Sequence, residues 1–164
     1  MKLYHGGLLK IEQPQIIEPS VLRTCDFGSG FYTTTDLEQA KRWAKIRQTR
    51  DRVSSGHVSI YEAPDDLLEA TDLKRLIFAS ASTEWLSFVM SNRTNREFNH
   101  DYDLVAGPVA NDRVYATLTL FETDQLSIAE TVHRLKTYTL VNQVLFHAEK
   151  AIRKLRYLAS ERIQ

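Results

Sequence analysis

Segments with strand periodicity and segments with helical periodicity follow one another along this chain without strict alternation. This order limits the possible folds more than any other feature of the sequence. Residues 1–5 alternate as a half-buried strand does, with Leu3 and His5 on one face and Tyr4 on the other. Further strands are expected at 30–34, around 58–60, at 102–106 and at 140–146. Because regular α/β folds repeat strand and helix in turn, the mixed order predicts an α+β fold.

Two capping-box patterns indicate where helices begin. One joins Thr35 to Glu38 and precedes apolar positions at helical spacing, and the other joins Ser127 to Glu130. Apolar spacing also predicts helices around 85–89 and 114–121. A last helix is expected to be lined by Ile152, Leu155, Leu158 and Ala159.

Composition excludes several classes of protein. The 164 residues suit one domain, expected to span 1–164, and 21 basic residues balance 21 acidic ones. This balance provides no general basic field for nucleic acid or an anionic membrane. No uncharged apolar run approaches the roughly 18 residues of a membrane-spanning helix. The N-terminus lacks an apolar signal region, and the lone Cys25 cannot form an internal disulfide, so we expect a cytoplasmic protein without a membrane partner.

Three polar residues lie inside otherwise apolar strands, where burial without partners is costly. They are His5, Tyr32 and Gln143. Each alone has a structural interpretation: a satisfied core histidine, a tyrosine that packs its ring, and a glutamine bonded to a loop. Their joint arrangement favours a site.

Residues 3–7 (LYHGG) resemble the first-strand His-Gly motif of the ADP-ribosyltransferase superfamily, in its His-Tyr-Glu branch, which includes diphtheria toxin and the poly(ADP-ribose) polymerases. Residues 27–32 (FGSGFY) resemble that branch's Phe-Gly-x-Gly-hydrophobic-Tyr segment, and Trp43 matches an aromatic residue eleven positions after the tyrosine. Residues 142–146 are similar to the surroundings of its catalytic glutamate. More narrowly, the chain resembles a bacterial family long catalogued only as a domain of unknown function and proposed to contain toxins of toxin–antitoxin pairs.

The resemblance implies a split β-sheet core with flanking helices and a site for NAD as substrate, without a metal. His5 would hydrogen-bond a ribose hydroxyl, and the backbone of Gly6 would clamp the nicotinamide amide. Tyr32 and Trp43 would stack against the nicotinamide ring, and Gly30 would allow a tight turn. His5, Tyr32 and Gln143 are the implied catalytic residues.

Gln143 departs from the family pattern, which has glutamate at this position. Glutamine keeps a hydrogen bond to a ribose hydroxyl but supplies neither negative charge nor a general base. Polymer elongation is therefore disfavoured. Transfer of a single ADP-ribose, simple NAD hydrolysis and an inactive NAD-binding module all stay open.

Other candidates are less specific. Arg23 precedes residues 27–32, called the glycine segment below. It is a candidate for contacting the pyrophosphate, with a surface ion pair as the alternative. Glu149 is the backup catalytic acid, although a helix cap or a solvated side chain is the preferred interpretation. Cys25 with His147 has no thiol-enzyme signature, and the five histidines show no paired metal-ligand spacing.

The sequence thus favours an enzyme of the glycosyltransferase class that transfers a pentosyl group, as a mono-ADP-ribosyltransferase. A bacterial toxin role implies an antitoxin partner and a protein or nucleic-acid acceptor that the sequence does not identify. The alternative is a catalytically inactive NAD- or ADP-ribose-binding module on the same fold.

Overall fold

A computed structural model describes residues 1–16, 25–95, 97–109 and 112–164. The strands are β1 (Lys2–Gly7), β2 (Phe31–Thr34), β3 (Gly56–Glu62), β4 (Arg75–Ile77), β5 (Leu104–Pro108), β6 (Asn142–Phe146) and β7 (Arg156–Ile163). The helices are α1 (Leu37–Asp51), α2 (Thr83–Thr94), α3 (Asp112–Glu122), α4 (Ile128–Lys136) and α5 (Glu149–Ile152), with a 3-10 turn at Leu67–Glu69. This content confirms the predicted α+β class.

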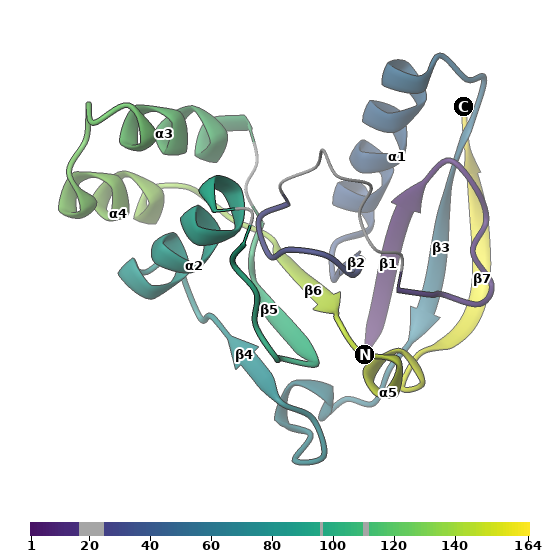
Figure 1. The fold of residues 1–164 in the computed structure, drawn as a ribbon. Helices are drawn as coiled ribbons and strands as arrows, with labels where there is room; N and C mark the ends of the chain where they lie inside the picture. The colour runs from purple at the N-terminus through teal and green to yellow at the C-terminus, as the bar shows by residue number, and fades with distance from the viewer. Residues whose placement is uncertain (17–24, 96, 110–111) are drawn as a thin grey trace.

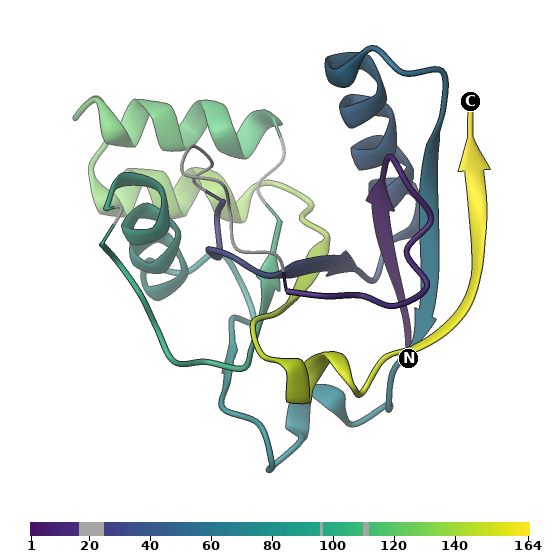
Figure 2. The same cartoon turned by 45° about the vertical axis from the view of Figure 1, so that its right-hand side comes forward.

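All seven described strands form one mixed sheet in the order β4-β5-β6-β2-β1-β3-β7. Only β4 and β5 pair in parallel. The ladder between β1 and β2 contains the single register pair Tyr4–Thr34, whereas β1 and β3 pair along the whole of β1. Figure 2 shows β2 running steeply across the direction of β1. The sheet therefore opens beside the Tyr4–Thr34 pair, and this opening positions the candidate site.

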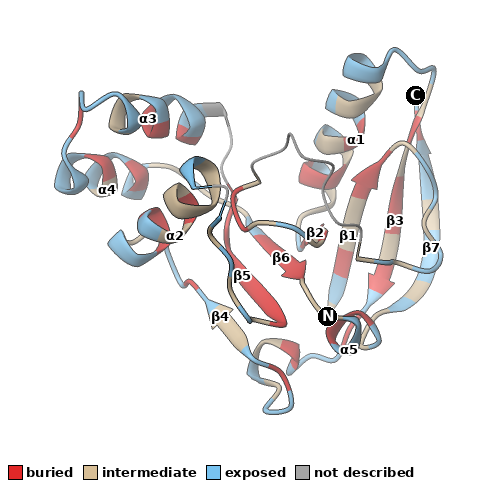
Figure 3. Cartoon of the chain, viewed as in Figure 1, coloured by how far each residue is buried: buried red, intermediate tan, exposed pale blue. Residues whose placement is uncertain are grey.

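The helices cover the two halves of the sheet separately. Figure 1 shows α2, α3 and α4 grouped beside β5 and β6, while α1 lies along β1 and β3. Figure 3 shows that the buried positions lie on the strands and on the helix faces turned toward them. Trp85 and Leu118 pack with Leu145 under the first group of helices, and Ala40 and Ala44 pack against β3 under α1. A further apolar cluster lines the other face of the sheet: Leu3, Phe31, Tyr61, Val144 and Phe146 are among its members.

One of the two predicted capping boxes forms at the start of its helix. The Ser127–Glu130 capping box is confirmed, with each residue's side chain accepting from the other's backbone N–H. The Thr35 box is wrong, because Asp36 caps α1 by accepting from the Gln39 N–H at 2.6 Å. Thr35 still belongs to the ladder, since its N–H donates to the Asn142 carbonyl.

The predicted last helix is wrong beyond Ile152, where α5 ends. Residues 156–163 form β7, which pairs antiparallel with β3 over its whole length. The free edge of β3 offers a long run of backbone partners, and this ladder outweighs a helical spacing of apolar residues. Strand β4 was not predicted. Within the described ranges, no helix combines the length and the apolar character needed to cross a membrane.

Candidate functional site

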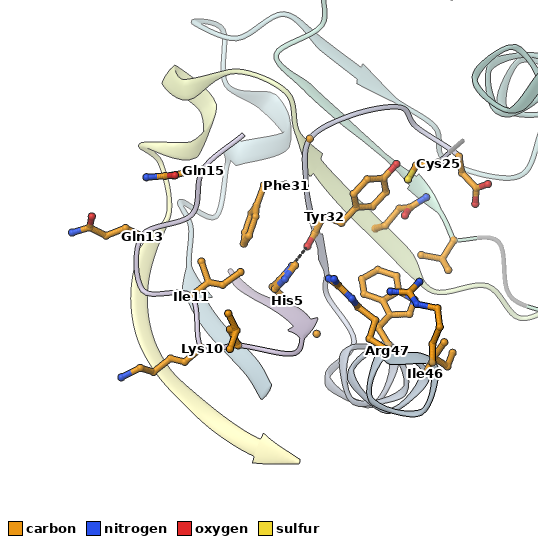
Figure 4. Close-up of a pocket in the computed structure, with 18 of the residues that line it drawn as sticks. His5, Lys10, Ile11, Gln13, Gln15, Cys25, Phe31, Tyr32, Ile46 and Arg47 are labelled. Carbon is orange, nitrogen blue, oxygen red and sulfur yellow. Dashed lines mark hydrogen bonds between the residues drawn. The ribbon is translucent and has the colours of Figure 1, made fainter. Parts of the chain in front are cut away.

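A cavity of about 790 Å³ lies at the opening of the sheet. It is lined from β1, β2, β6, α1, α3 and the segments 9–15 and 25–26. Six of the residues predicted from sequence line it: His5, Gly6, Gly30, Tyr32, Trp43 and Gln143. Arg23 lies outside the described residues. The structure thus brings together segments that are far apart in sequence (Figure 4).

The His5 imidazole bridges the point where β1 and β2 separate. Its Nδ1 lies 2.7 Å from the Tyr32 carbonyl oxygen, and its ring stacks on Phe31 with centroids 4.6 Å apart. A carbonyl oxygen only accepts hydrogen bonds, so Nδ1 carries the proton and donates. The regular ladder stops one residue earlier, at Tyr4 and Thr34, and the side chain of His5 satisfies the next exposed carbonyl of β2.

His5 is therefore fixed as a neutral ring with a lone pair on Nε2. Burial lowers the pKa of His5, the hydrogen bond to Tyr32 opposes this, and the charge of Arg47 lowers the pKa further. The Nε2 atom has no hydrogen-bond partner among the described residues. Its lone pair can accept a hydrogen bond from a hydroxyl group.

The Tyr32 hydroxyl is occupied by backbone partners. It donates to the Gly28 carbonyl at 2.8 Å and accepts from the Phe27 N–H at 3.2 Å. Burial raises the pKa of Tyr32 well above its usual range, so the group stays protonated. Tyr32 holds the glycine segment in place, and its ring, not its hydroxyl, is what it offers to a ligand.

Two glycines of the site are required by packing. A Cβ on Gly30 would lie 2.5 Å from the Phe146 carbonyl oxygen, and one on Gly6 would lie 2.0 Å from the Ala40 carbonyl oxygen. Both distances are far below a van der Waals contact, so any side chain would push β1 from α1 or β2 from β6. Packing alone explains the absence of a side chain at Gly6.

Gln143 sits at the centre of the sheet with an unsatisfied amide. It pairs with Gly107 of β5 on one side and Thr34 of β2 on the other, and it is only 3% exposed. Its Nε2 has no hydrogen-bond partner among the described residues. A buried amide donor without a partner costs about 1–3 kcal/mol. Such a group in a cavity wall is ready to donate to a ligand oxygen.

His5 and Gln143 reach the cavity from different faces of β2. Cross-strand partners share a face, so Tyr32 lies with Leu145, and Thr34 lies with Gln143, on the face opposite Phe31. His5 stacks on Phe31. The three predicted catalytic residues therefore surround one cavity without converging on one point, which suits contacts to separate parts of an extended ligand.

Two residues of the cavity were missed by sequence reasoning. Asp26 is a 7% exposed carboxylate, and its Oδ1 lies 3.4 Å from Nη1 of Arg93. Burial together with the negative charge of Asp26 raises the pKa of Tyr115 to about 12, and the charge of Asp26 also contributes to the raised pKa of Tyr32. Asp26 directly precedes the glycine segment, which was its only signal in the sequence.

Arg47 is the second missed residue. It follows Trp43 by four positions on α1, so the two share a helix face, and both line the cavity. Its Nε is buried without a hydrogen-bond partner in the described part of the chain. The i, i+4 relation to Trp43 was a usable signal.

Glu149 and His147 do not line the cavity. Glu149 is exposed in the first turn of α5 and does not line the cavity, so the backup acid is corrected to a solvated helix residue. His147 donates from Nδ1 to the Ser29 carbonyl at 2.6 Å and packs edge-on against His100. Burial lowers the pKa of His147 to about 4. Cys25 lines the cavity, whereas His147 does not.

The fold and cavity define an α+β protein with a small-molecule-sized site at the opening of a mixed sheet. The chain belongs to the family described as "Protein of unknown function (DUF3990)", whose family model matches residues 1–157. Neither a curated protein nor a solved structure matches the chain.

Proposed function

We propose that this protein is an NAD-dependent mono-ADP-ribosyltransferase. The observation that carries the proposal is the meeting of His5, Tyr32, Trp43 and Gln143 on one cavity, although they come from four elements spread over most of the chain. These are the positions that the resemblance to the superfamily assigns to NAD. An accidental sequence resemblance would not require them to share a cavity.

The size and lining of the cavity support a dinucleotide-like ligand. Its 790 Å³ falls within the range of about 300–1,000 Å³ that is usual for small-molecule sites. Aromatic surface from Tyr32 and Trp43 suits planar rings, and the unpartnered amide of Gln143 suits an oxygen acceptor. The free lone pair of His5 suits a ribose hydroxyl.

The proposed reaction breaks the bond between C1′ of the ribose and N1 of nicotinamide. The bonding electron pair leaves with nicotinamide, which becomes neutral, and the ribose carbon becomes oxocarbenium-like. A nucleophile of the acceptor then forms a bond to C1′ and loses its proton to solvent or to a base on the acceptor. When water is the nucleophile, the product is free ADP-ribose.

The roles of the chain's own residues follow from their atoms. His5 accepts from a ribose hydroxyl at Nε2, because Nδ1 is committed to Tyr32. Gln143 donates its unpaired amide to an oxygen of the other ribose of the dinucleotide and orients that sugar.

The absence of a carboxylate at position 143 limits the reaction to good nucleophiles. No general base stands at the glutamate position, so elongation of an ADP-ribose polymer is not expected. We propose a single transfer to a macromolecular acceptor, protein or nucleic acid, in the cytoplasm of a bacterium. The biological role proposed with it is that of a toxin restrained by an antitoxin.

A second candidate is a non-catalytic NAD- or ADP-ribose-binding module. Gln143 in place of a carboxylate favours it, as does the Tyr32 hydroxyl, which is committed to the backbone of residues 27 and 28. Both functions require the ligand to bind in the same cavity. NAD labelled in its nicotinamide separates them, because only the enzyme releases labelled nicotinamide.

A further inference from the structure

Arg47 combines a buried Nε with a guanidinium that has no partner among the described residues. It makes no hydrogen bond and no ion pair with any described residue, and its Nε is buried. By contrast, Arg93 bonds Glu122 and Asp26, Arg50 bonds Asp51, and Arg42 bonds Gln39. A charged donor set that is partly removed from water without an acceptor is costly.

The position of Arg47 is defined by its neighbours in the cavity. Its Nη1 and the Nε2 of His5 lie 4.0 Å and 3.1 Å from the point that a Cβ on Gly7 would occupy. Figure 4 shows the Arg47 side chain extending from α1 toward His5. Gly7 thus leaves space between a guanidinium and an imidazole lone pair.

No carboxylate of the described cavity lining is placed to neutralise Arg47. Glu12 pairs with Lys10 at 2.7 Å, and Asp26 pairs with Arg93 at 3.4 Å. His5 is neutral, with its pKa lowered by burial and by Arg47 itself. Among the described residues, the guanidinium therefore has no neutralising carboxylate and lies beside a hydrogen-bond acceptor.

We propose that Arg47 is the phosphate-binding residue of the cavity and holds the pyrophosphate of the dinucleotide. The planar guanidinium matches two phosphate oxygens at once, and the neighbouring Nε2 of His5 accepts from the hydroxyl of an adjoining ribose. Trp43, one helical turn earlier, then contacts a ring of the same ligand. The identity of the ligand as NAD rests on the proposed function, but the preference for a diphosphate ester does not depend on catalysis.

The test compares two ligands that differ in their phosphates. ADP-ribose carries the pyrophosphate and adenosine carries none, and calorimetry measures the affinity of each for the full-length protein. Arg47→Ala should weaken ADP-ribose binding by about tenfold to a hundredfold, the usual loss for charge-assisted hydrogen bonds, and leave adenosine binding within about threefold. Arg47→Lys should recover part of the loss. Arg42→Ala, on the same helix but outside the cavity, should bind both ligands as wild type does.

A second measurement separates a binding role from a structural one. An unpartnered guanidinium destabilises the free protein, so Arg47→Met should melt at the same temperature as wild type or higher. A lower melting temperature with equal losses for ADP-ribose and adenosine would overturn the proposal. Unchanged ADP-ribose affinity in Arg47→Ala, or no binding of ADP-ribose by wild type, would also overturn it.

The outcomes for the two proposals can be told apart. If wild type releases no nicotinamide but binds ADP-ribose in an Arg47-dependent way, the enzyme function fails and the phosphate site stands. If nicotinamide is released but the affinity for ADP-ribose does not change in Arg47→Ala, the phosphate assignment fails and the enzyme function stands.

Discussion

The imidazole Nδ1 of His5 donates to the carbonyl oxygen of Tyr32 at 2.7 Å, next to the single register pair that joins the two halves of the sheet. This contact fixes the tautomer of His5, holds its Nε2 as an acceptor in the cavity and replaces a ladder hydrogen bond at the opening. Because His5 supports the sheet and is proposed to bind the ligand, substitutions at His5 should affect both the stability and the proposed activity.

The first prediction separates these two effects. His5→Ala removes the hydrogen bond and the stacking on Phe31, so it should lower the free energy of unfolding by about 1–3 kcal/mol and abolish detectable nicotinamide release. His5→Asn keeps a short side-chain donor for the Tyr32 carbonyl and should regain stability without activity. Urea unfolding and nicotinamide release measure the two quantities. Full activity in His5→Ala would remove His5 from the site.

The second prediction concerns pH. Burial lowers the pKa of His5, His100 and His147, the last to about 4. Between the unfolded value near 6.5 and these folded values, the unfolded state binds more protons than the folded state. The contribution of these histidines to the free energy of unfolding should therefore be fully present above about pH 6.5. It should be lost as the pH drops toward 4.

Urea unfolding at several pH values tests this dependence. Ordinary carboxylates titrate below about pH 4.5, so the slope between pH 6.5 and 5 reports on the histidines. His147→Asn should flatten that slope. A flat profile between pH 7 and 5 in wild type would contradict the buried neutral histidines.

The third prediction divides the ring of Tyr32 from its hydroxyl. Tyr32→Phe loses the hydrogen bonds to Gly28 and Phe27 and should cost about 1–2 kcal/mol of stability, with kcat/KM for nicotinamide release within about threefold of wild type. Tyr32→Ala should lose both stability and activity. A large loss of kcat in a folded Tyr32→Phe protein would show that the hydroxyl acts in the reaction.

The fourth prediction uses the two tryptophans. Trp43 lines the cavity, whereas Trp85 is fully buried and donates from Nε1 to the Pro108 carbonyl. NAD should quench the fluorescence of Trp43, because a nicotinamide ring stacked nearby alters its emission. The quench should vanish in Trp43→Phe and persist in Trp85→Phe. The reverse pattern would place the ligand elsewhere.

Local sequence patterns predicted most of the helices and strands and singled out three polar residues. Strand alternation singled out His5, Tyr32 and Gln143 as polar residues in apolar strands, and all three line the cavity. Their orientation could not be predicted, because it depends on the register of β2 with β1 and β6. The register with β6 is set by pairs more than 100 residues apart in sequence, such as Thr34 with Gln143, and the register with β1 by the single pair Tyr4–Thr34.

Tertiary pairing also explains the main error in the fold. The apolar spacing of Ile152, Leu155 and Leu158 fits a helix, but the chain leaves the helical conformation after Ile152 to pair with β3. Nothing local indicates that β3 has a free edge. Arg47 was missed because its lack of a partner among the described residues depends on tertiary contacts, which no local pattern shows.

The fifth prediction concerns Gln143. If its amide orients the ribose by hydrogen bonding, Gln143→Ala should lower turnover at least about tenfold, near 1.4 kcal/mol for one lost contact in the transition state. Gln143→Glu adds charge stabilisation and should raise the ratio of NAD hydrolysis to transfer. Nicotinamide released and ADP-ribose attached are measured for each variant. Wild-type values in both variants, with His5→Ala inactive, would make Gln143 structural.

Cleavage of NAD in the cavity is tested most simply by measuring the release of nicotinamide. Wild-type protein and His5→Ala are incubated with nicotinamide-labelled NAD, with and without a fractionated bacterial lysate as a source of acceptors. We expect time-dependent release of labelled nicotinamide by wild type, faster with lysate, and no detectable release by His5→Ala. No release by wild type under any of these conditions would contradict the claim and leave the binding module as the function of the fold.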